Sequence, residues 1–230
     1  MSINGINVIR EAFRPSSWYY SLFVYTERIL SSLHSLLTMK IAIFGGSFNP
    51  IHNGHIALAR SVIEQRKADE VWLLVSPHNP LKPQRGLLPE ELRLRIAREA
   101  VADIDGIRVS DVEFRLPRPS YTWATLGALS SEYPEHEFSL LIGADNWALF
   151  PRWAHYSDIL ERYSLLVYPR PGYPLNSSEL PPNVHLIAAP EYPFSSTEVR
   201  HRLRQGLDVS GMVPPCVEQE LREYKWSGEE

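Results

Sequence analysis

Short apolar runs alternate with longer amphipathic stretches over residues 39–230. The apolar runs predict strands at 40–44, 71–75, 107–112, 138–142, 164–168 and 184–188. The stretches between and after them have apolar residues at helical spacing, which predicts helices near 54–66, 89–102, 121–132, 145–162 (broken), 196–205 and 215–225. This alternation indicates βαβ units, and therefore an α/β, doubly wound, mostly parallel sheet with helices on both faces. Ligands of such sheets bind at the carboxyl ends of the strands.

The first 38 residues differ from the rest of the chain. An apolar stretch at 18–25 is interrupted by Glu27 and Arg28, so it falls short of the roughly 18 apolar residues that a membrane span needs. The same break, without a small-residue cleavage site, disfavours a signal peptide. Two readings remain: a short amphipathic helix over about 18–37, or a start assigned upstream of the natural one at Met39. We favour the second, which makes 1–38 an N-terminal extension and 39–230 a single domain.

Composition excludes several classes of protein. Apolar residues make up 44% and charged residues 22% of the chain, which is ordinary globular usage. The net charge, 23 − 27 = −4, gives no global attraction to nucleic acid or to an anionic membrane, so any phosphate site must be local. The single cysteine, Cys216, excludes a disulfide within the chain and a cysteine-based zinc site, and it indicates a reducing, cytoplasmic environment. A homo-oligomer remains open.

The strongest motif follows the first strand. It reads Gly45-Gly46-Ser47-Phe48-Asn49-Pro50-Ile51-His52-Asn53-Gly54-His55, and it is neither a P-loop nor a dinucleotide fingerprint. The glycine pair permits close approach of a ligand, and His52 and His55 share one face of a helical turn. Gly54 leaves room between them for a ring or a phosphate. With the amides of a helix N-terminus, these groups predict a polyphosphate site; an ordinary loop or half of a metal site is the alternative.

A second motif, Ser195-Ser196-Thr197-Glu198-Val199-Arg200, has the spacing of a capping box. A well-capped helix explains it on its own. Arg200, about one turn into that helix, could join the helix amides around a terminal phosphate. Lys82, between Pro80 and Pro83, is a candidate phosphate clamp, with a solvated surface lysine as the alternative.

Candidates for a second substrate come from four further positions. Trp153 suits stacking on a flat ring, or else core packing. Asp145 follows Gly143 at a strand end, where it could accept ribose hydroxyls or cap a helix. Thr122 and its neighbouring amides could bind a carboxylate or carboxamide, or cap a helix, and Arg170 is the fourth candidate.

The string at 45–55 resembles the signature of the nucleotidyltransferase superfamily with the His-x-Gly-His motif, and within it the bacterial nicotinate-nucleotide adenylyltransferase family. The resemblance runs from Met39 to about Trp226. Its further matches, in chain order, are Ser76-Pro77-His78-Asn79-Pro80-Leu81-Lys82, Pro119-Ser120-Tyr121-Thr122, Ile142-Gly143-Ala144-Asp145, Trp153, Arg170-Pro171-Gly172-Tyr173 and the motif at 195–200. Asn49 stands where many relatives carry Asp, and 1–38 has no counterpart. The resemblance implies a Rossmann-like fold.

The resemblance also implies an activity: transfer of AMP from ATP to nicotinate mononucleotide, giving nicotinate adenine dinucleotide and pyrophosphate in NAD biosynthesis. The catalytic residues it implies are His52, His55, Lys82 and Arg200. The ATP-binding residues are Gly45, Gly46, Ser47, Phe48, His52, His55, Gly143, Asp145, Ser195, Ser196, Thr197 and Arg200. The mononucleotide-binding residues are Ser47, Lys82, Thr122, Trp153 and Arg170. Mg²⁺ is expected on the ATP phosphates, without a metal site of the protein's own.

Three alternatives stay open. Within the superfamily, the chain could be a nicotinamide-mononucleotide or a pantetheine-phosphate adenylyltransferase, although Trp153 and the stretch 170–173 favour a pyridine nucleotide over pantetheine. From a different class, it could be a non-catalytic nucleotide sensor on the same fold. The intact set of His52, His55, Lys82 and Arg200 argues against a sensor.

Overall fold

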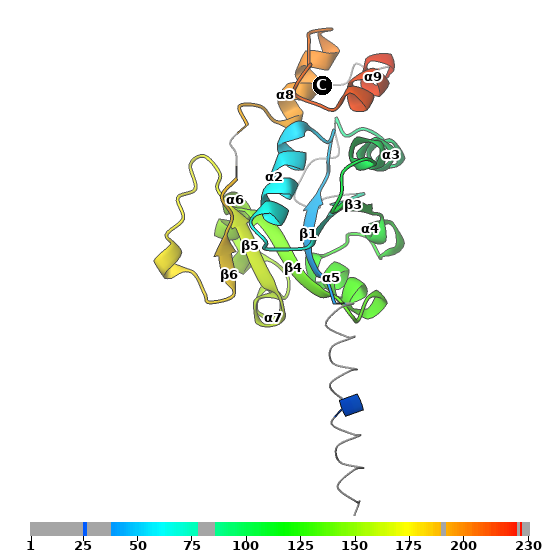
Figure 1. The fold of residues 1–230 in the computed structure, drawn as a ribbon. Coiled ribbons are helices and arrows are strands. Elements are labelled where there is room, and N and C mark those ends of the chain that lie inside the picture. The colour runs from blue at the N-terminus through cyan, green and yellow to red at the C-terminus, as the bar shows by residue number, and fades with distance from the viewer. Residues whose placement is uncertain (1–24, 27–37, 78–85, 190–191, 225, 227–230) are drawn as a thin grey trace, which may run out of the picture. The chain divides into compact units, whose positions relative to one another are not determined.

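A computed structural model describes residues 25–26, 38–77, 86–189, 192–224 and 226 (Figure 1). The chain divides into two compact units, residues 1–38 and 39–230. In the first unit the described Tyr25 and Thr26 are helical, and the rest of the helix expected at 18–37 lies outside the described residues.

Six strands form one sheet in the second unit: β1 (Lys40–Gly46), β2 (Glu70–Val75), β3 (Ile107–Ser110), β4 (Glu137–Gly143), β5 (Ser164–Tyr168) and β6 (Val184–Leu186). Their order is β3-β2-β1-β4-β5-β6, and every pairing is parallel, so the expected "mostly parallel" sheet is entirely parallel. β1 pairs with β2 on one side and with β4 on the other. The strand order reverses there, which makes the carboxyl ends of β1 and β4 the expected ligand position.

The helices confirm the predicted alternation. They are α2 (Asn53–Glu64), α3 (Glu90–Val101), α4 (Val112–Arg115), α5 (Thr122–Glu132), α6 (Ala144–Leu149), α7 (Tyr156–Arg162), α8 (Ser196–Arg204) and α9 (Pro215–Glu223), with 3₁₀ turns η1 (Phe150–Arg152) and η2 (Ser177–Glu179). The broken helix expected at 145–162 is α6, η1 and α7 in succession.

Two predicted strands are shorter than expected. The strand predicted at 107–112 ends at Ser110, whose Oγ accepts a hydrogen bond from the Val112 N–H at 3.3 Å. The Val112 N–H is therefore bonded to a neighbouring side chain, and the helix α4 begins at Val112. The strand predicted at 184–188 ends at Leu186, although the Ile187 N–H still donates to the Val167 carbonyl.

Alternate residues of each strand pack on opposite faces of the sheet, as the two-residue period of a strand requires. On β1, Ala42 and Phe44 join a core with α2, α3, α8 and α9, whereas Ile41 and Ile43 join a core with α4, α5 and α7. Both faces are therefore covered, and the near-continuous apolar runs of the strands follow from burial on both sides.

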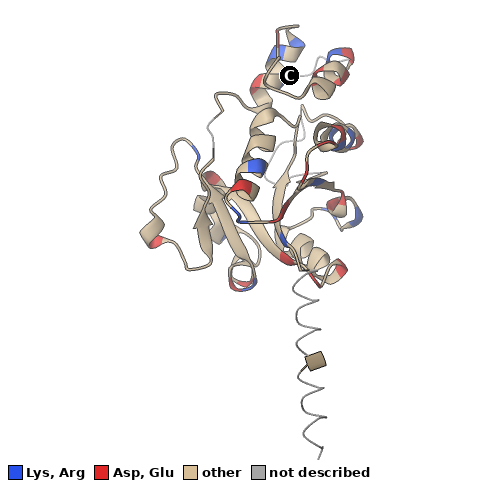
Figure 2. Cartoon of the chain, in the orientation of Figure 1, with Lys and Arg blue, Asp and Glu red and all other residues tan. Residues whose placement is uncertain are grey.

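Charges of both signs lie together on the outer helices, as Figure 2 shows for α3 and α9. Arg95 of α3 and Glu220 of α9 illustrate this, with a 2.5 Å ion pair between the two helices.

Among the described residues no helix combines the length and the apolar character that crossing a membrane requires.

Candidate active site

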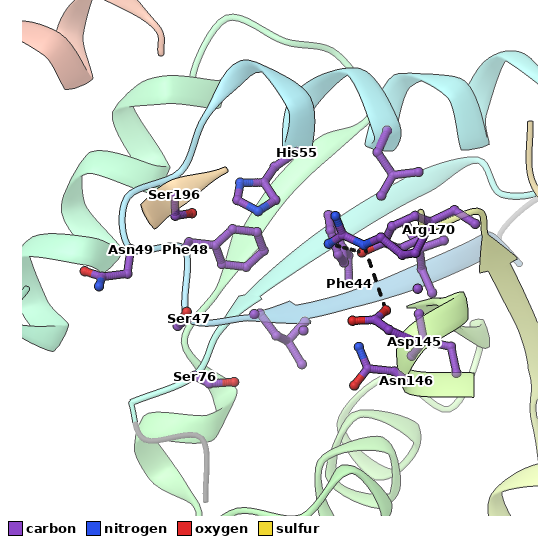
Figure 3. Close-up of a pocket in the computed structure, with 18 of the residues that line it drawn as sticks. Phe44, Ser47, Phe48, Asn49, His55, Ser76, Asp145, Asn146, Arg170 and Ser196 are labelled. Atoms are coloured by element: carbon purple, nitrogen blue, oxygen red, sulfur yellow. Dashed lines mark hydrogen bonds and ion pairs between the residues drawn. The ribbon is translucent and has the colours of Figure 1, made fainter. Parts of the chain in front are cut away.

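A cavity of about 1040 Å³ opens at the carboxyl ends of β1 and β4, where the strand order reverses. Of the residues that the sequence singled out, its walls contain Gly45, Gly46, Ser47, Phe48, His52, His55, Thr122, Gly143, Asp145, Trp153, Arg170, Ser195, Ser196, Thr197 and Arg200. Lys82 lies outside the described residues. Motifs far apart in the chain therefore meet around one space (Figure 3).

The first motif presents His55 in a defined tautomer. His52 is the N-cap of α2, and its backbone N–H donates to Nδ1 of His55 at 3.2 Å. An imidazole nitrogen that accepts a hydrogen bond carries no proton, so the neutral His55 ring bears its proton on Nε2. His55 is thereby arranged as a hydrogen-bond donor in the wall of the cavity.

His52 stacks on His55, with ring centroids 3.6 Å apart and planes inclined by 19°. Burial, and secondarily the charge of Arg170, lowers the pKa of His52 to about 4. Because the charged form loses its hydration on burial and is repelled by Arg170, His52 is neutral at physiological pH.

This shift makes stability depend on pH. The unfolded chain protonates His52 below about pH 6.5, whereas the folded chain does so only below about pH 4. The stability that the neutral ring contributes is therefore complete above pH 6.5 and is lost as the pH falls towards 4, by up to about 3 kcal/mol. We expect His52→Gln to flatten the fall of melting temperature over that window. The exposed His201 provides the matched control, since His201→Gln should leave the slope unchanged.

Two glycines of the first motif lie in tight surroundings. A Cβ on Gly46 would lie 3.2 Å from the Phe48 ring, and one on Gly54 would lie 3.0 Å from the His52 ring. The room for a ligand expected between the two histidines is absent because their rings stack on each other, although Gly54 itself lines the cavity. Phe48 has a φ of 41°, and its ring packs edge-on to Phe44 and His55 at 5.5 and 5.0 Å. Such a backbone persists only where packing imposes it.

Asn49 links the first motif to the segment that precedes α3. Its Nδ2 donates to the Gly86 carbonyl at 3.0 Å, and its Oδ1 accepts from the Leu88 N–H at 2.9 Å. Figure 3 shows its side chain directed away from His55. An ionised Asp could accept from Leu88 but could not donate to Gly86, so the amide at this position has a structural reason in this chain.

The second motif lines the cavity next to the first motif. Ser195 caps α8, its Oγ accepting from the Glu198 N–H at 3.3 Å, which confirms the predicted N-cap. Arg200 donates from Nη1 to the Asn49 carbonyl at 2.8 Å and from Nη2 to Thr197 Oγ1 at 3.2 Å. Ser196 Oγ donates to the Pro50 carbonyl at 3.0 Å. These contacts place the N-terminus of α8 beside that of α2.

Across the cavity from His55, Asp145 and Arg170 lie together (Figure 3). Arg170 Nε is 3.9 Å from Asp145 Oδ1, and Arg170 Nη2 donates to the Tyr168 hydroxyl at 3.1 Å. A Cβ on Gly143 would overlap Asp145 Oδ1 in its present position, so the missing side chain lets this carboxylate lie beside the strand end. Asp145 lies in the first turn of α6, whose N-cap is Gly143, and its buried Oδ1 has no hydrogen-bond partner among the described residues.

Trp153 and Thr122 line the remaining part of the cavity. Trp153 is half-buried, with its ring centroid 5.5 Å from that of Phe150, and its Nε1 is buried without a partner among the described residues. Thr122 is the first residue of α5, whose N-cap Tyr121 makes no side-chain cap hydrogen bond.

Sequence reasoning missed a buried carboxylate in the cavity wall. Glu113, 8% exposed, accepts hydrogen bonds from Ser120 Oγ and Thr125 Oγ1, both at 3.2 Å. Burial raises its pKa, against the effect of these donors and of Ser76. The sequence predicted a strand up to residue 112 and no helix directly after it. Glu113 is instead the second residue of the short helix α4.

The described residues contain no group of three or more His, Cys, Asp or Glu side chains that could hold a metal ion. Two helix N-termini, with Arg200 and two imidazoles, instead make a site suited to anions. A Rossmann-like sheet with such a site at its switch point defines a nucleotide-binding protein of the nucleotidyltransferase class.

Comparison with known proteins leads to the same class of protein. Residues 43–202 match the family model described as cytidylyltransferase-like. A nicotinate-nucleotide adenylyltransferase of Bacteroides fragilis (strain YCH46) is 51% identical over 178 residues, which cover 77% of this chain and 89% of the relative. The chain belongs to the cytidylyltransferase-like family and, within it, to the nicotinate-nucleotide adenylyltransferases.

Solved structures give the same fold. A crystal structure described as a nicotinate-nucleotide adenylyltransferase of Vibrio parahaemolyticus matches with a TM-score of 0.61 and 26% identity, covering 79% of this chain and 97% of that one. A nicotinic acid mononucleotide adenylyltransferase of Plasmodium falciparum, complexed with NaAD, matches with a TM-score of 0.65 and 19% identity, over 79% and 93% of the chains. At that identity the second match supports the fold alone.

Proposed function

We propose that this chain transfers AMP from ATP to nicotinate mononucleotide, giving nicotinate adenine dinucleotide and pyrophosphate. The observation that carries the proposal is the meeting of the α2 and α8 N-termini around one cavity, through the hydrogen bonds of Arg200 and Ser196 to the Asn49 and Pro50 carbonyls. The opposite wall, with Asp145, Arg170 and Trp153, leaves room for a second nucleotide.

Direct in-line transfer fits these residues. An oxygen of the mononucleotide 5′-phosphate attacks the α-phosphorus of ATP, and the bond from that phosphorus to the bridging oxygen breaks as pyrophosphate leaves. No covalent enzyme intermediate is required, so positioning and charge stabilisation supply the catalysis. His55, through Nε2–H, and the adjacent His52 would stabilise charge on the α- and β-phosphate oxygens.

The leaving phosphates fit the second motif. Arg200 and the α8 N-terminus, with the hydroxyls of Ser195, Ser196 and Thr197, would hold the β- and γ-phosphates. The strand end at Gly45-Gly46-Ser47-Phe48 would lie against the triphosphate, since a Cβ on Gly45 would meet nothing within 4 Å. Gly143 and Asp145 would take the ribose of ATP. Lys82 remains a prediction as the bridge between the two reacting phosphates.

The mononucleotide would occupy the space lined by Ser47, Thr122, Trp153 and Arg170. The α5 N-terminus at Thr122 has no acidic residue in its first turn and no side-chain cap, so its amides are suited to an anionic carboxylate. Trp153 would stack on the pyridine ring.

Mg²⁺ is proposed to arrive on the ATP phosphates, where it would neutralise the charge that builds up during transfer. The substrates are then the partners, without nucleic acid or membrane, in the cytoplasm. Residues 39–230 would form the nucleotidyltransferase domain, since all the described lining residues lie within it.

Pyrophosphate release on mixing the protein with Mg-ATP and nicotinate mononucleotide tests the proposal. We expect this substrate to react with the highest kcat/KM when it is compared with nicotinamide mononucleotide and phosphopantetheine. Preference for either of the others would transfer the proposal to that substrate, and ATP binding without any pyrophosphate would favour a nucleotide sensor.

A further inference from the structure

Arg93 of α3 is a buried cation directly behind the first motif. Its side chain is 1% exposed and does not line the cavity. Nη1 donates to the carbonyls of Ser47 and Ser76, at 2.5 and 2.8 Å. Nη2 donates to the Pro77 carbonyl at 2.9 Å, and Nε donates to the Leu88 carbonyl at 3.0 Å. One guanidinium therefore joins the loops that follow β1 and β2 to the segment before α3.

The environment of this charge is unusual because the acceptors are all backbone carbonyls. Among the described residues no carboxylate lies within ion-pair distance of Arg93. Burial lowers the pKa of the guanidinium, and the more distant Glu90 raises it. An arginine nevertheless stays protonated in proteins. Burying a charge is costly, and a fold that needed only packing at this position could use an apolar side chain instead.

The contact with Ser47 has a consequence for the site. The Ser47–Phe48 peptide is trans, so its N–H points opposite to its C=O. Because the Ser47 carbonyl faces Arg93, the Phe48 N–H faces away from Arg93, and both Ser47 and Phe48 line the cavity. An N–H held in this direction is a donor to an anion in the cavity.

We propose that Arg93 is a positioning residue for adenylyl transfer: its guanidinium fixes the Ser47–Phe48 peptide so that the Phe48 N–H binds a phosphate of ATP, and it places a buried positive charge behind that phosphate. This inference rests on the proposed function. It assigns to Arg93 its main effect on the ATP side of the reaction, through the Phe48 N–H, and a smaller one on the nicotinate side, through Ser47.

Arg93→Lys and Arg93→Met separate this role from packing. Lysine keeps the charge but cannot reach four carbonyls in the planar fork of arginine, and methionine keeps the length without charge or donors. In folded protein we expect kcat/KM for ATP to fall at least tenfold in Arg93→Lys and further in Arg93→Met. The KM for nicotinate mononucleotide should stay within about twofold. Losing one donor to a charged group is enough for a change of this size.

Arg95, two residues along α3 and paired with Glu220 at the surface, is the matched control. Arg95→Lys and Arg95→Met should leave both substrate constants unchanged. Arg93 variants that lower only the melting temperature, or that weaken both substrates equally, would assign Arg93 to the fold and overturn the proposal. The proposed function and the role of Arg93 can fail separately. A wild-type protein without activity towards nicotinate mononucleotide would refute the proposed function. Arg93 variants with an unchanged kcat/KM for ATP would refute only this inference.

A measurement on the wild-type chain covers the case in which both Arg93 variants fail to fold. Titration with Mg-ATP, followed by amide NMR, should shift the Phe48 resonance and slow the exchange of its proton. A Phe48 amide that neither shifts nor gains protection when ATP saturates the site would overturn the proposal, whatever the variants do.

Discussion

His55→Ala is expected to lower kcat by about 10²–10³, with a small change in KM for either substrate. The hydrogen bond from the His52 N–H to Nδ1 holds the ring, which lines the cavity, and leaves Nε2–H as the donor of the neutral ring. Removing one preorganised donor to charge that develops in a transition state typically costs this factor, or about 2.7–4 kcal/mol. Single-turnover measurement of pyrophosphate formation reports this step without product release.

Two conservative variants identify the atom involved. Asparagine can keep an acceptor for the His52 N–H, whereas it has no donor at the position of Nε2. Glutamine reaches further and can present an amide N–H there. We therefore expect His55→Asn to be nearly as slow as His55→Ala, with a melting temperature lowered by the loss of the ring's contacts with His52 and Phe48, and His55→Gln to recover part of the rate. Full activity in His55→Asn would show that Nε2 takes no part in catalysis.

The neighbouring histidine provides a second comparison. His52→Ala removes the ring stacked on His55 and a buried neutral imidazole, so we expect slower turnover together with a lower melting temperature. The two histidines thus differ in the ratio of rate loss to stability loss, because His52 is also a packed N-cap residue of α2.

Trp153→Ala should raise the KM for nicotinate mononucleotide about tenfold or more and leave the KM for ATP nearly unchanged. Stacking is worth on the order of 0.5–1.5 kcal/mol beyond area burial, and the lost apolar contact adds about 25 cal/mol per Å². Roughly 1.4 kcal/mol corresponds to a factor of ten in binding.

Trp147 offers a close control for the packing part of this effect. It is also half-buried and stacks on Phe150 with centroids 5.5 Å apart, but it does not line the cavity. We expect Trp147→Ala to lower the melting temperature with both substrate constants preserved. If Trp153→Ala behaves in the same way, Trp153 is a core residue and does not bind the mononucleotide.

Local patterns were sufficient to predict most of the architecture. The strands are buried on both faces and read as apolar runs, and the Ser195 cap and the His52–His55 pair are set by spacings of three residues. Interactions between neighbours in the chain need no knowledge of distant segments, so they can be read from the sequence. The predicted end of strand β3 was wrong. The apolar Val112 continues the strand pattern of the sequence, but in the structure its N–H is bonded to Ser110 Oγ.

The sequence by itself determined the order of the elements, the two motifs proposed to bind phosphate, and the kind of side chains available to each. Only the tertiary structure decided that Arg200 meets the Asn49 carbonyl, that Glu113 lies buried beside Thr125, and that Arg93 stands behind the first motif. An arginine inside a helix has the same local pattern whether it faces water or four carbonyls. Its role depends on long-range contacts, which arise only when parallel strands bring their carboxyl ends to one edge of the sheet.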